Sequence, residues 1–261
     1  EIYTLSLHDA LPILVDLSAL SDMAGDFVVA TAGPDLESVL SARGAGTDYM
    51  SEKDRNVMAN IDIGGGTSNI AVFKQGVLMG TSCLDIGGRL IKVSEGKISY
   101  VYEKIKDFAK TKGIDIKEGD RAEPATLKKI AHFMAEQLAM AVGVKEKDDV
   151  HKALYTNEGV PLSEDLKIDG ITFSGGVADI VYNPKQGDDF RYGDIGPMLG
   201  NAVNEGRYFE SVKRYEAVET IRATVVGAGT HTTEVSGSTI RYEEADRKST
   251  RLNSSHWLTS R

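Results

Sequence analysis

The residues best suited to chemistry lie in one short segment, NIDIGGGTSNIAVF, between Asn60 and Phe73. Asp62 stands near the end of a first apolar run, three glycines follow, and Thr67 and Ser68 add two hydroxyls before a second apolar run. Consecutive glycines let a backbone take positive φ and approach a ligand closely, and successive amides in such a bend form a concave anion site. A carboxylate beside the bend can hold the water shell of a metal ion against a phosphate. The segment therefore predicts a phosphate-binding loop on a β-hairpin.

This loop differs from the Walker type of phosphate loop, because no Gly-Lys-Ser/Thr follows and the next element is a strand rather than a helix. A plain hairpin turn is the simpler alternative, since paired glycines are ordinary turn signals. A turn accounts for one or two glycines, but not for the aspartate, three glycines and two hydroxyls together. We therefore favour a nucleotide site.

Two further glycine pairs occur where one element gives way to the next. Gly87 and Gly88, in DIGGR, are expected to join a strand to a helix, and by themselves they are typical of a turn. Gly175 and Gly176, in FSGGVAD, are also expected between a strand and a helix, where small residues let a flat base lie against the backbone. Arg89 starts the first of these predicted helices and has two equal interpretations, a cleft residue or the partner of a surface carboxylate.

Other residues of chemically active types lack the partners that a site would need. Cys83 has no neighbouring histidine or second cysteine, so we expect a structural role. His132 is expected on an ordinary helix face, and His231 follows a glycine bend without a partner. The GxG of VVGAGTHT lacks a third glycine, so a dinucleotide site is not predicted there. The loop with Phe190, Arg191 and Tyr192 is equally consistent with a partner contact and with packing on its own domain.

The elements that position these residues follow from the sequence pattern. FVVATA (27–32) predicts a buried strand, and DLESVLSARG predicts a short helix with Asp35 as N-cap and Gly44 at its end. The polar segment 47–58 is expected to be a loop. Alternating apolar residues from Asn60 to Asp85, with tight turns, predict an antiparallel three-stranded meander.

The second half of the chain alternates between helix and strand. Residues 97–110 are ambiguous, whereas ATLKKIAHFMAEQLAMAVG predicts a helix that ends at Gly143. Its apolar stripe consists of Leu127, Ile130, Ala131, Met134, Leu138 and Ala141. We expect strand, glycine pair and helix over 166–182, a loop that leads into a helix over 188–206, and two or three strands over 219–240. The fold class is therefore α/β or α+β.

Both ends of the chain back-translate onto a common short-read sequencing adapter, so we expect residues 1–13 and 246–261 not to be native. The chain carries a net charge of −9 and the ends carry +1, which leaves −10 on residues 14–245. This acidity argues against nucleic acid or an anionic membrane as the main partner. One cysteine excludes an internal disulfide framework, and no apolar run has the roughly 18–20 residues of a membrane span.

The order of these motifs resembles the second half of the actin-like ATPase superfamily, with IDIGGGTSN similar to its second phosphate motif and FSGGVAD to its adenosine motif. GDFVVATAGPDLESVLSARGAG, TSCLDIGGRLI, FRYGDIGPMLGNAV and IRATVVGAGTHTTEVSGSTI extend the resemblance to reactivating factors of ethanolamine ammonia-lyase over nearly all of residues 14–245. The match is weakest over 93–166. The resemblance implies a ribonuclease H-like actin-type ATPase fold, present in part, with residues 14–57 ending a first lobe and 58–245 forming a nucleotide-binding lobe.

The resemblance also implies roles for single residues. Gly64, Gly65, Gly66, Thr67 and Ser68 would hold phosphate oxygens of ATP or ADP, Asp62 would lie near Mg²⁺, Gly87 and Gly88 would sit at the cleft, and Gly175 and Gly176 would line the adenosine. We identify no catalytic residue.

The implied activity is ATP-dependent release of damaged cobalamin from ethanolamine ammonia-lyase, so that adenosylcobalamin can rebind. A cytoplasmic location is implied, with a bacterial microcompartment and a homo-oligomer left open. The family's first phosphate motif and its region beyond Ala245 are not in this sequence, which we interpret as truncation, and we expect the chain alone to be inactive. A small-molecule kinase and a filament-forming relative are the alternatives, and a kinase would need a carboxylate base that we do not find.

Overall fold

The computed structural model describes residues 34–184 and 187–229. All the described residues belong to one compact unit that begins at Pro34. The predicted strand at 27–32, the two predicted adapter segments and His231 lie outside the described residues.

A five-stranded mixed sheet forms the centre of the described unit, with the strand order β3-β2-β1-β6-β7. Its strands are β1 (Val57–Ile63), β2 (Ser68–Lys74), β3 (Val77–Leu84), β6 (Gly170–Ser174) and β7 (Lys213–Arg214). The strands β1, β2 and β3 pair antiparallel, so the predicted meander is confirmed. β6 lies parallel to β1 on the other side, and β7 lies parallel to β6.

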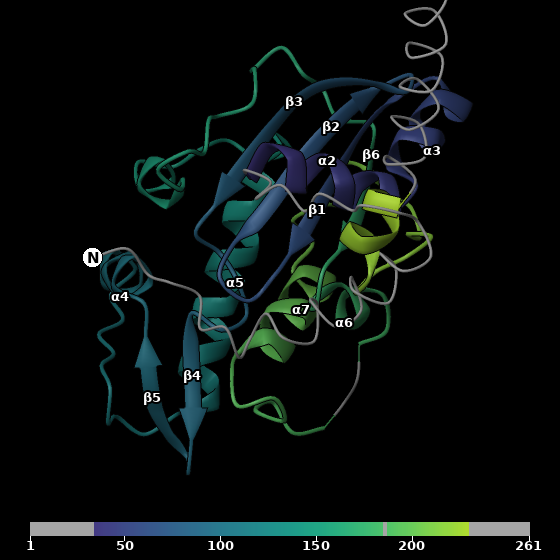
Figure 1. Cartoon of the computed structure of the whole chain (residues 1–261). Coiled ribbons are helices and arrows are strands. Elements are labelled where there is room, and N and C mark those ends of the chain that lie inside the picture. Colours follow the sequence, from purple (N-terminus) through teal and green to yellow (C-terminus); the bar gives the residue numbers. More distant parts are fainter. Residues whose placement is uncertain (1–33, 185–186, 230–261) are drawn as a thin grey trace, which may run out of the picture. The chain divides into compact units, whose positions relative to one another are not determined.

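Helices cover both faces of this sheet (Figure 1). On one face, Ala71 and Phe73 of β2 pack with Ala42 of α2 (Pro34–Gly44). On the other face, Ile70 and Val72 point into the main core, as expected from the alternation of side chains along a strand. That core is completed by α5 (Pro124–Ala141), α6 (Ala178–Tyr182) and α7 (Gly196–Glu205). The expectation of a mixed α/β sheet with flanking helices is confirmed.

The helix α5 agrees closely with its predicted stripe. All six stripe residues are buried, and the helix begins with Pro124 in its first turn. Gly143 follows at φ +74°, a left-handed conformation that suits glycine after a helix end. The helix predicted at Asp35 begins one residue earlier, at Pro34, so Asp35 is not its N-cap.

The helix predicted after Gly87 and Gly88 is wrong. These residues form a turn that leads into β4 (Ile91–Ser94), which pairs with β5 (Lys97–Val101) in a separate two-stranded sheet. Ile91 and Val93 are buried and alternate with exposed neighbours, which is the pattern of a half-buried strand. The ambiguous segment 97–110 contains both elements, because β5 is followed directly by α4 (Glu103–Thr111).

The loop predicted over 47–58 is also wrong, because Thr47–Asp54 forms α3. Its inward face is polar rather than apolar: the Thr47 hydroxyl lies 2.7 Å from that of Thr172, and the Ser51 hydroxyl accepts from the Gly76 N–H. Hydrophobic periodicity therefore gives no signal for this helix, which packs on β1 and β2 and is hydrogen-bonded to Thr172 of β6 and to the turn after β2.

The strands predicted from residue 219 onward are not found in the described part of that segment, where residues 223–229 are helical. Small residues bring this helix against α2. A β-carbon on Gly44 would lie 1.8 Å from the Ala223 carbonyl oxygen, and one on Gly227 would lie 1.9 Å from that of Leu40. Close backbone contact, available only to glycine, outweighs the β propensity of the adjacent Thr and Val residues.

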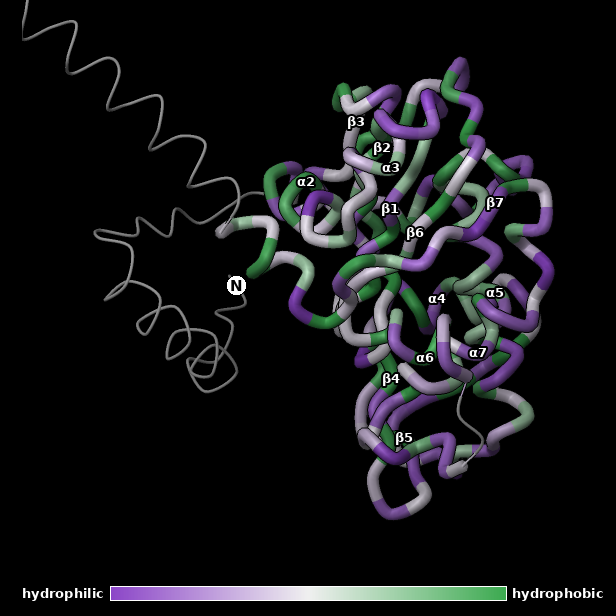
Figure 2. The backbone as a smooth tube through the Cα atoms, turned by 90° about the vertical axis from the view of Figure 1, so that its right-hand side faces the viewer, coloured by the Kyte–Doolittle hydropathy of each residue, from purple (hydrophilic) through white to green (hydrophobic). Residues whose placement is uncertain are grey.

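The last strand of the sheet is short and hydrophilic, and Figure 2 shows it in purple at the edge of the unit. Both residues of β7, Lys213 and Arg214, are exposed. Charged side chains on a short edge strand oppose pairing with another chain. None of the helices formed by residues 34–184 and 187–229 is long and apolar enough to cross a membrane.

The contact between α2 and residues 223–229 predicts the effect of Gly44→Ala. Alanine has the higher intrinsic helix propensity, so the substitution alone would favour α2 by up to about 1 kcal/mol. The methyl group would overlap the Ala223 carbonyl, so we expect a net destabilisation of roughly 1–3 kcal/mol and faster hydrogen exchange over 223–229. Urea unfolding and exchange mass spectrometry measure both effects. A stabilised variant with unchanged exchange would contradict the contact.

Candidate functional site

The glycine bend closes the hairpin between β1 and β2. The Gly64 N–H donates to the Thr67 carbonyl over 2.9 Å, which folds the chain back within four residues. Gly66 is exposed, and a β-carbon built on it would meet nothing within 4 Å. The predicted bend between two antiparallel strands is confirmed.

The segment DIGGR holds this bend from one side. The N–H of Gly88 donates to the Gly64 carbonyl over 3.0 Å, and the N–H of Arg89 donates to the Gly65 carbonyl over 2.7 Å. Gly87 lies directly against the bend, since a β-carbon there would be 2.4 Å from the Gly65 oxygen. The carbonyls of the bend are thereby turned towards DIGGR and satisfied.

In contrast to these carbonyls, three backbone N–H groups of the bend have no hydrogen-bond acceptor in the described part of the chain. The N–H groups of Gly65, Gly66 and Thr67 donate to no acceptor among residues 34–184 and 187–229. Neighbouring backbone N–H groups without protein acceptors form the kind of concave site that binds anions. The arrangement therefore supplies donors for a phosphate.

The strand–glycine–glycine–helix junction meets the end of β1. The Val177 N–H donates to the Ile63 carbonyl over 3.2 Å, and a β-carbon on Gly175 would lie 2.5 Å from that oxygen. Gly175 also has φ +85°, which strains any other residue. Gly176 is exposed with open space beside it. The two glycines thus have different tasks, close packing for Gly175 and an open surface for Gly176.

A pocket of about 500 Å³ joins these segments. It is lined by Gly64, Gly65, Gly88, Arg89, Gly176, Val177, Ile180, Tyr192, Asp194, Gly196 and Ile221. The pocket brings together glycines from the bend, from DIGGR and from the strand–helix junction. The lining of this pocket does not include Gly66, Thr67, Ser68, Gly87, Gly175 or Asp62. What the pocket binds stays a prediction.

The sequence carries a signal for this pocket that the motif analysis missed. Asp-Ile-Gly occurs three times, ending at Gly64, Gly87 and Gly196. Each of the three isoleucines is fully buried, and the first and third glycines line the pocket while the second packs on the bend. Asp194 belongs to the third copy and Tyr192 precedes it, in the loop for which the sequence left a partner contact and packing on its own domain equally open.

Asp62 lies at the end of β1 on the sheet face that α2 covers. Its carboxylate is 7 % exposed, and Oδ1 accepts a hydrogen bond from the Ser174 hydroxyl over 2.7 Å. Burial raises the pKa of Asp62 to about 6, and the negative charge of Glu37 also raises it. The hydrogen bond from Ser174 lowers this pKa but does not offset the effect of burial. No cluster of three acidic, histidine or cysteine side chains that could hold a metal is found in the described part of the chain.

The other residues singled out in the sequence lie outside the lining of the pocket. The Ser68 hydroxyl is buried and donates to the Ile86 carbonyl over 2.7 Å, so its hydrogen bond is already made within the protein. Thr67 is half-buried at the exit of the bend. Cys83 is buried beside Asn69, and burial raises the pKa of its thiol to about 11, in keeping with a structural role. His132 contacts the Tyr208 hydroxyl from the surface of α5.

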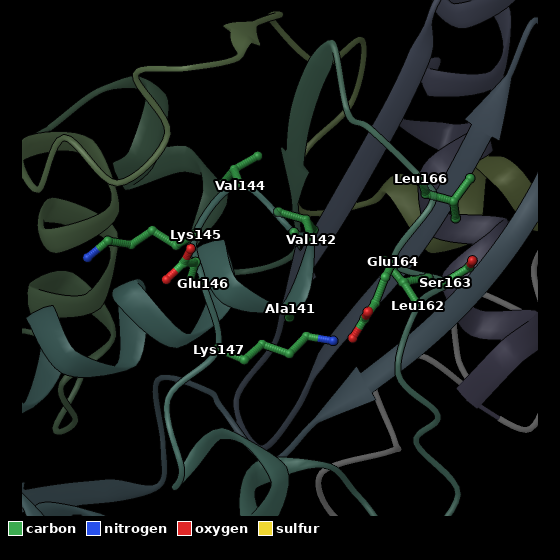
Figure 3. Close-up of a pocket in the computed structure, with 11 residues that line it drawn as sticks. Ala141, Val142, Val144, Lys145, Glu146, Lys147, Leu162, Ser163, Glu164 and Leu166 are labelled. Atoms are coloured by element: carbon green, nitrogen blue, oxygen red, sulfur yellow. The ribbon is translucent and has the colours of Figure 1, made fainter.

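A second pocket, of about 590 Å³, lies at the C-terminal end of α5 (Figure 3). It is lined by the segments 141–147 and 162–166, and its charged side chains include Lys147 and Glu164, which point toward one another. The residues predicted to bind nucleotide do not line it. The smaller pocket is therefore the candidate site, because it is the one that the glycine segments form.

We expect the same substitution to have different effects on stability at the two adjacent glycines of FSGGVAD. Gly175→Ala places a methyl group at positive φ and against the Ile63 carbonyl, so we expect a destabilisation of roughly 1–3 kcal/mol. Gly176→Ala meets open space, so we expect a change within about 0.5 kcal/mol. Urea unfolding of both variants checks this difference. Equal stability losses would show that the junction is assigned wrongly.

Asp62 predicts a pH-dependent stability cost. Its raised pKa means that folding disfavours the ionised form, so the cost is absent below about pH 4, grows up to about pH 6 and is constant above. Asp62→Asn keeps an oxygen for Ser174 and removes the charge. We expect it to stabilise the protein by on the order of 3 kcal/mol at pH 7.5 and by only about 1 kcal/mol at pH 4.5.

Urea unfolding at both pH values tests this, with Asp107→Asn as the control. Asp107 lies exposed on α4, so the control removes the same charge without removing a buried one. A gain for Asp62→Asn that is equal at the two pH values, or that the control reproduces, would refute the assignment.

Comparison with known proteins identifies relatives of this chain. The family model described as "Ethanolamine utilisation protein EutA" matches residues 13–247. The "Ethanolamine ammonia-lyase reactivase EutA" of Salmonella typhimurium is 38 % identical over 230 residues, which is 87 % of this chain and 48 % of the relative. The protein of the same description from Escherichia coli is 38 % identical over 229 residues, 86 % of this chain and 48 % of the relative. The chain thus spans about half the length of the curated relatives it matches.

Solved structures resemble the chain only distantly. The activator of 2-hydroxyisocaproyl-CoA dehydratase from Clostridium difficile, solved with bound ADPNP, has a TM-score of 0.34 and 12 % identity, over 79 % of this chain and 69 % of its own. A Ppx/GppA family member from Aquifex aeolicus reaches a TM-score of 0.38 with 15 % identity, over 77 % and 63 %. Similarity at this level carries no conclusion about function. The match of the family model to most of the chain does: this chain belongs to the EutA family.

Proposed function

We propose that this chain is the nucleotide-binding part of an ATP-dependent reactivating factor for ethanolamine ammonia-lyase. The observation that carries the proposal is the 38 % identity to reactivases over most of the chain, which includes the glycine bend and its pocket. The free amides of the bend supply what such a factor needs first, a place for the phosphates of a nucleotide.

The pocket suits a nucleotide at both of its ends. Gly65 lines one end of the pocket, and its amide, with those of Gly66 and Thr67 that follow it in the chain, would bind the phosphates. The open surface of Gly176 would accept a flat ring system. Apolar or aromatic side chains of Val177, Ile180, Tyr192 and Ile221 complete the lining, as in most small-molecule sites. In this proposal the phosphates lie over the bend and the base lies near the start of α6.

The residues present could hold Mg²⁺ through one carboxylate, that of Asp62. Asp62 offers one carboxylate whose Oδ1 is held by Ser174 and whose Oδ2 has no hydrogen bond among the described residues. Mg²⁺ usually keeps several waters and takes one or two carboxylates plus substrate phosphates. We propose that Asp62 orients a water of the ion, which would neutralise phosphate charge. Because the ion requires the ionised carboxylate, its affinity should fall below about pH 6.

Nucleotide binding can drive reactivation only if the nucleotide distinguishes two conformations of the protein. A ligand shifts a conformational equilibrium by its difference in affinity for the two states. We propose that ATP and ADP favour different arrangements of the site, and that one arrangement loosens damaged cobalamin from the lyase so that adenosylcobalamin can enter. This function is carried out in the cytoplasm.

The nucleotide proposal predicts direct binding by this chain. Calorimetric titration with ATP and with ADP, each in Mg²⁺, should show saturable binding at one site. Gly176→Leu fills the open side of the pocket, so it should lower affinity for both nucleotides at least about tenfold while urea stability stays near that of the wild type. Unchanged affinity in this variant would place the nucleotide elsewhere.

The reactivation proposal needs a separate assay, because binding does not establish activity. Lyase inactivated with cyanocobalamin is incubated with ATP, Mg²⁺, adenosylcobalamin and either this chain or its reading frame extended to the length of the curated relatives. We expect turnover to return with the extended protein and not with this chain, since positioning supplies much of the rate in phosphoryl transfer. Asp62→Ala in the extended protein should abolish the recovery, and Asp107→Ala should leave it unchanged. No recovery with the wild-type extended protein would refute the proposed function.

A further inference from the structure

Arg89 occupies a position that the proposed nucleotide site leaves unexplained. Its side chain lies directly over the glycine bend, because a β-carbon built on Gly65 would be 3.1 Å from Arg89 Cδ. Its backbone N–H donates to the Gly65 carbonyl, so the Arg89 backbone and β-carbon cannot move away from the bend without breaking that hydrogen bond. The guanidinium is nonetheless free to turn, since the side chain is 68 % exposed.

The partner of Arg89 is a carboxylate that the protein keeps buried. Asp194 Oδ2 lies 3.7 Å from Arg89 Nε, and the Asp194 side chain is only 9 % exposed. Its other oxygen, Oδ1, accepts from the N–H of Gly196 over 2.9 Å, at the start of α7. Burial raises the pKa of Asp194, while the Gly196 N–H and the positive charge of Arg89 lower it. The ion pair is therefore loose on the arginine side and fixed on the aspartate side.

Both members of this pair line the pocket together with Gly65, one of the three bend residues whose N–H groups donate to no acceptor among the described residues. A polyphosphate seated on those amides would bring several negative charges beside Arg89 and beside Asp194. Attraction to the arginine and repulsion from the aspartate act in the same direction, so the guanidinium would turn from the carboxylate to the phosphate. Arginine binds phosphate with two parallel N–H donors, which a single contact at 3.7 Å to Asp194 does not provide.

We propose that Arg89 reads the phosphate chain of the nucleotide by exchanging Asp194 for a phosphate oxygen. The inference rests on the proposed nucleotide site and assigns its phosphate specificity to this residue. Arg89 thereby favours nucleotides with more phosphate charge, and Asp194 holds it in place while the site is empty of ligand.

The exchange reaches beyond the pocket because Asp194 is tied to two other elements. The backbone of Asp194 forms an isolated antiparallel β-bridge with that of Lys92 in β4, and the Val93 N–H donates to the Gly193 carbonyl over 2.8 Å. The Ile195 N–H donates to the Gly88 carbonyl over 3.1 Å, next to Arg89 itself. Loss of the ion pair therefore changes the charge balance where β4, DIGGR and α7 meet.

The test is calorimetric titration of ATP, ADP and adenosine into the wild-type chain and five variants. Arg89→Gln should weaken ATP at least about tenfold, ADP less, and adenosine by no more than about twofold. Asp194→Asn keeps an oxygen for the Gly196 N–H, removes the competing charge, and should tighten ATP. That gain should shrink when Arg89→Gln is added, because the two residues compete for one interaction.

Lys92→Gln is the matched control, since it removes a nearby cation that does not line the pocket. It should change ATP affinity by less than about threefold. Arg89→Lys keeps the charge without the paired donors and should fall between the wild type and Arg89→Gln. Urea unfolding should show wild-type stability for Arg89→Lys, which keeps a cation beside Asp194, and a loss of no more than about 1 kcal/mol for Arg89→Gln, because the Arg89 side chain is largely exposed.

The outcomes separate the two proposals. Wild-type binding of ATP that Arg89→Gln leaves unchanged would overturn the role of Arg89 and leave the nucleotide site intact. Equal weakening of ATP and adenosine would also overturn it, because the residue would then support the pocket rather than read phosphate. No binding of ATP or adenosine by the wild type would overturn the nucleotide site and this inference together.

Discussion

The parallel pairing of β1 with β6 is the constraint on which the site depends. Asp62 lies opposite Ser174 in this pairing, so both strands end at the same edge of the sheet. The Ile63 carbonyl then accepts the Val177 N–H and leaves space for no side chain at Gly175. Two glycine segments more than 100 residues apart in the chain are thereby set side by side. A shift of one residue in this register would move Asp62 to the other face of the sheet.

The same pairing builds a chain of buried polar side chains across the sheet. The Thr47 hydroxyl meets that of Thr172 at 2.7 Å, Thr172 reaches Asn60 Oδ1 at 3.0 Å, and Asn60 Nδ2 donates to Ser174, which donates to Asp62. Every member has at least one hydrogen-bond partner within this network, as burial requires. This row of hydrogen-bonded side chains explains why α3 has a polar inward face, because the sheet surface that the helix covers is itself polar.

Elements with an apolar period were predictable from the sequence, and elements held by backbone contacts or polar side chains were not. The meander, α5 and the junction before α6 follow from alternation, a helical stripe and paired glycines. The helix α3 could not be found in this way, because its buried residues Thr47 and Ser51 are polar. The helix at 223–229 depends on Gly44, which lies far away in the sequence. In the site, the glycines were visible as a motif, whereas Asp194 acquires its place through tertiary contacts, those of Gly88 with the start of α7 and of Val93 with Gly193.

The donor and acceptor order of these hydrogen bonds affects the ionisation of Asp62. Ser174 receives a hydrogen bond from the Asn60 amide, so its single proton is left for Asp62 Oδ1. That donor favours the ionised carboxylate, while burial opposes it, and the resulting pKa of about 6 leaves most Asp62 ionised near neutral pH. A structural role would be met equally well by asparagine, which needs no buried charge. Retaining the carboxylate at a cost to stability is expected where an ion or a phosphate-bound water compensates the charge in the working state.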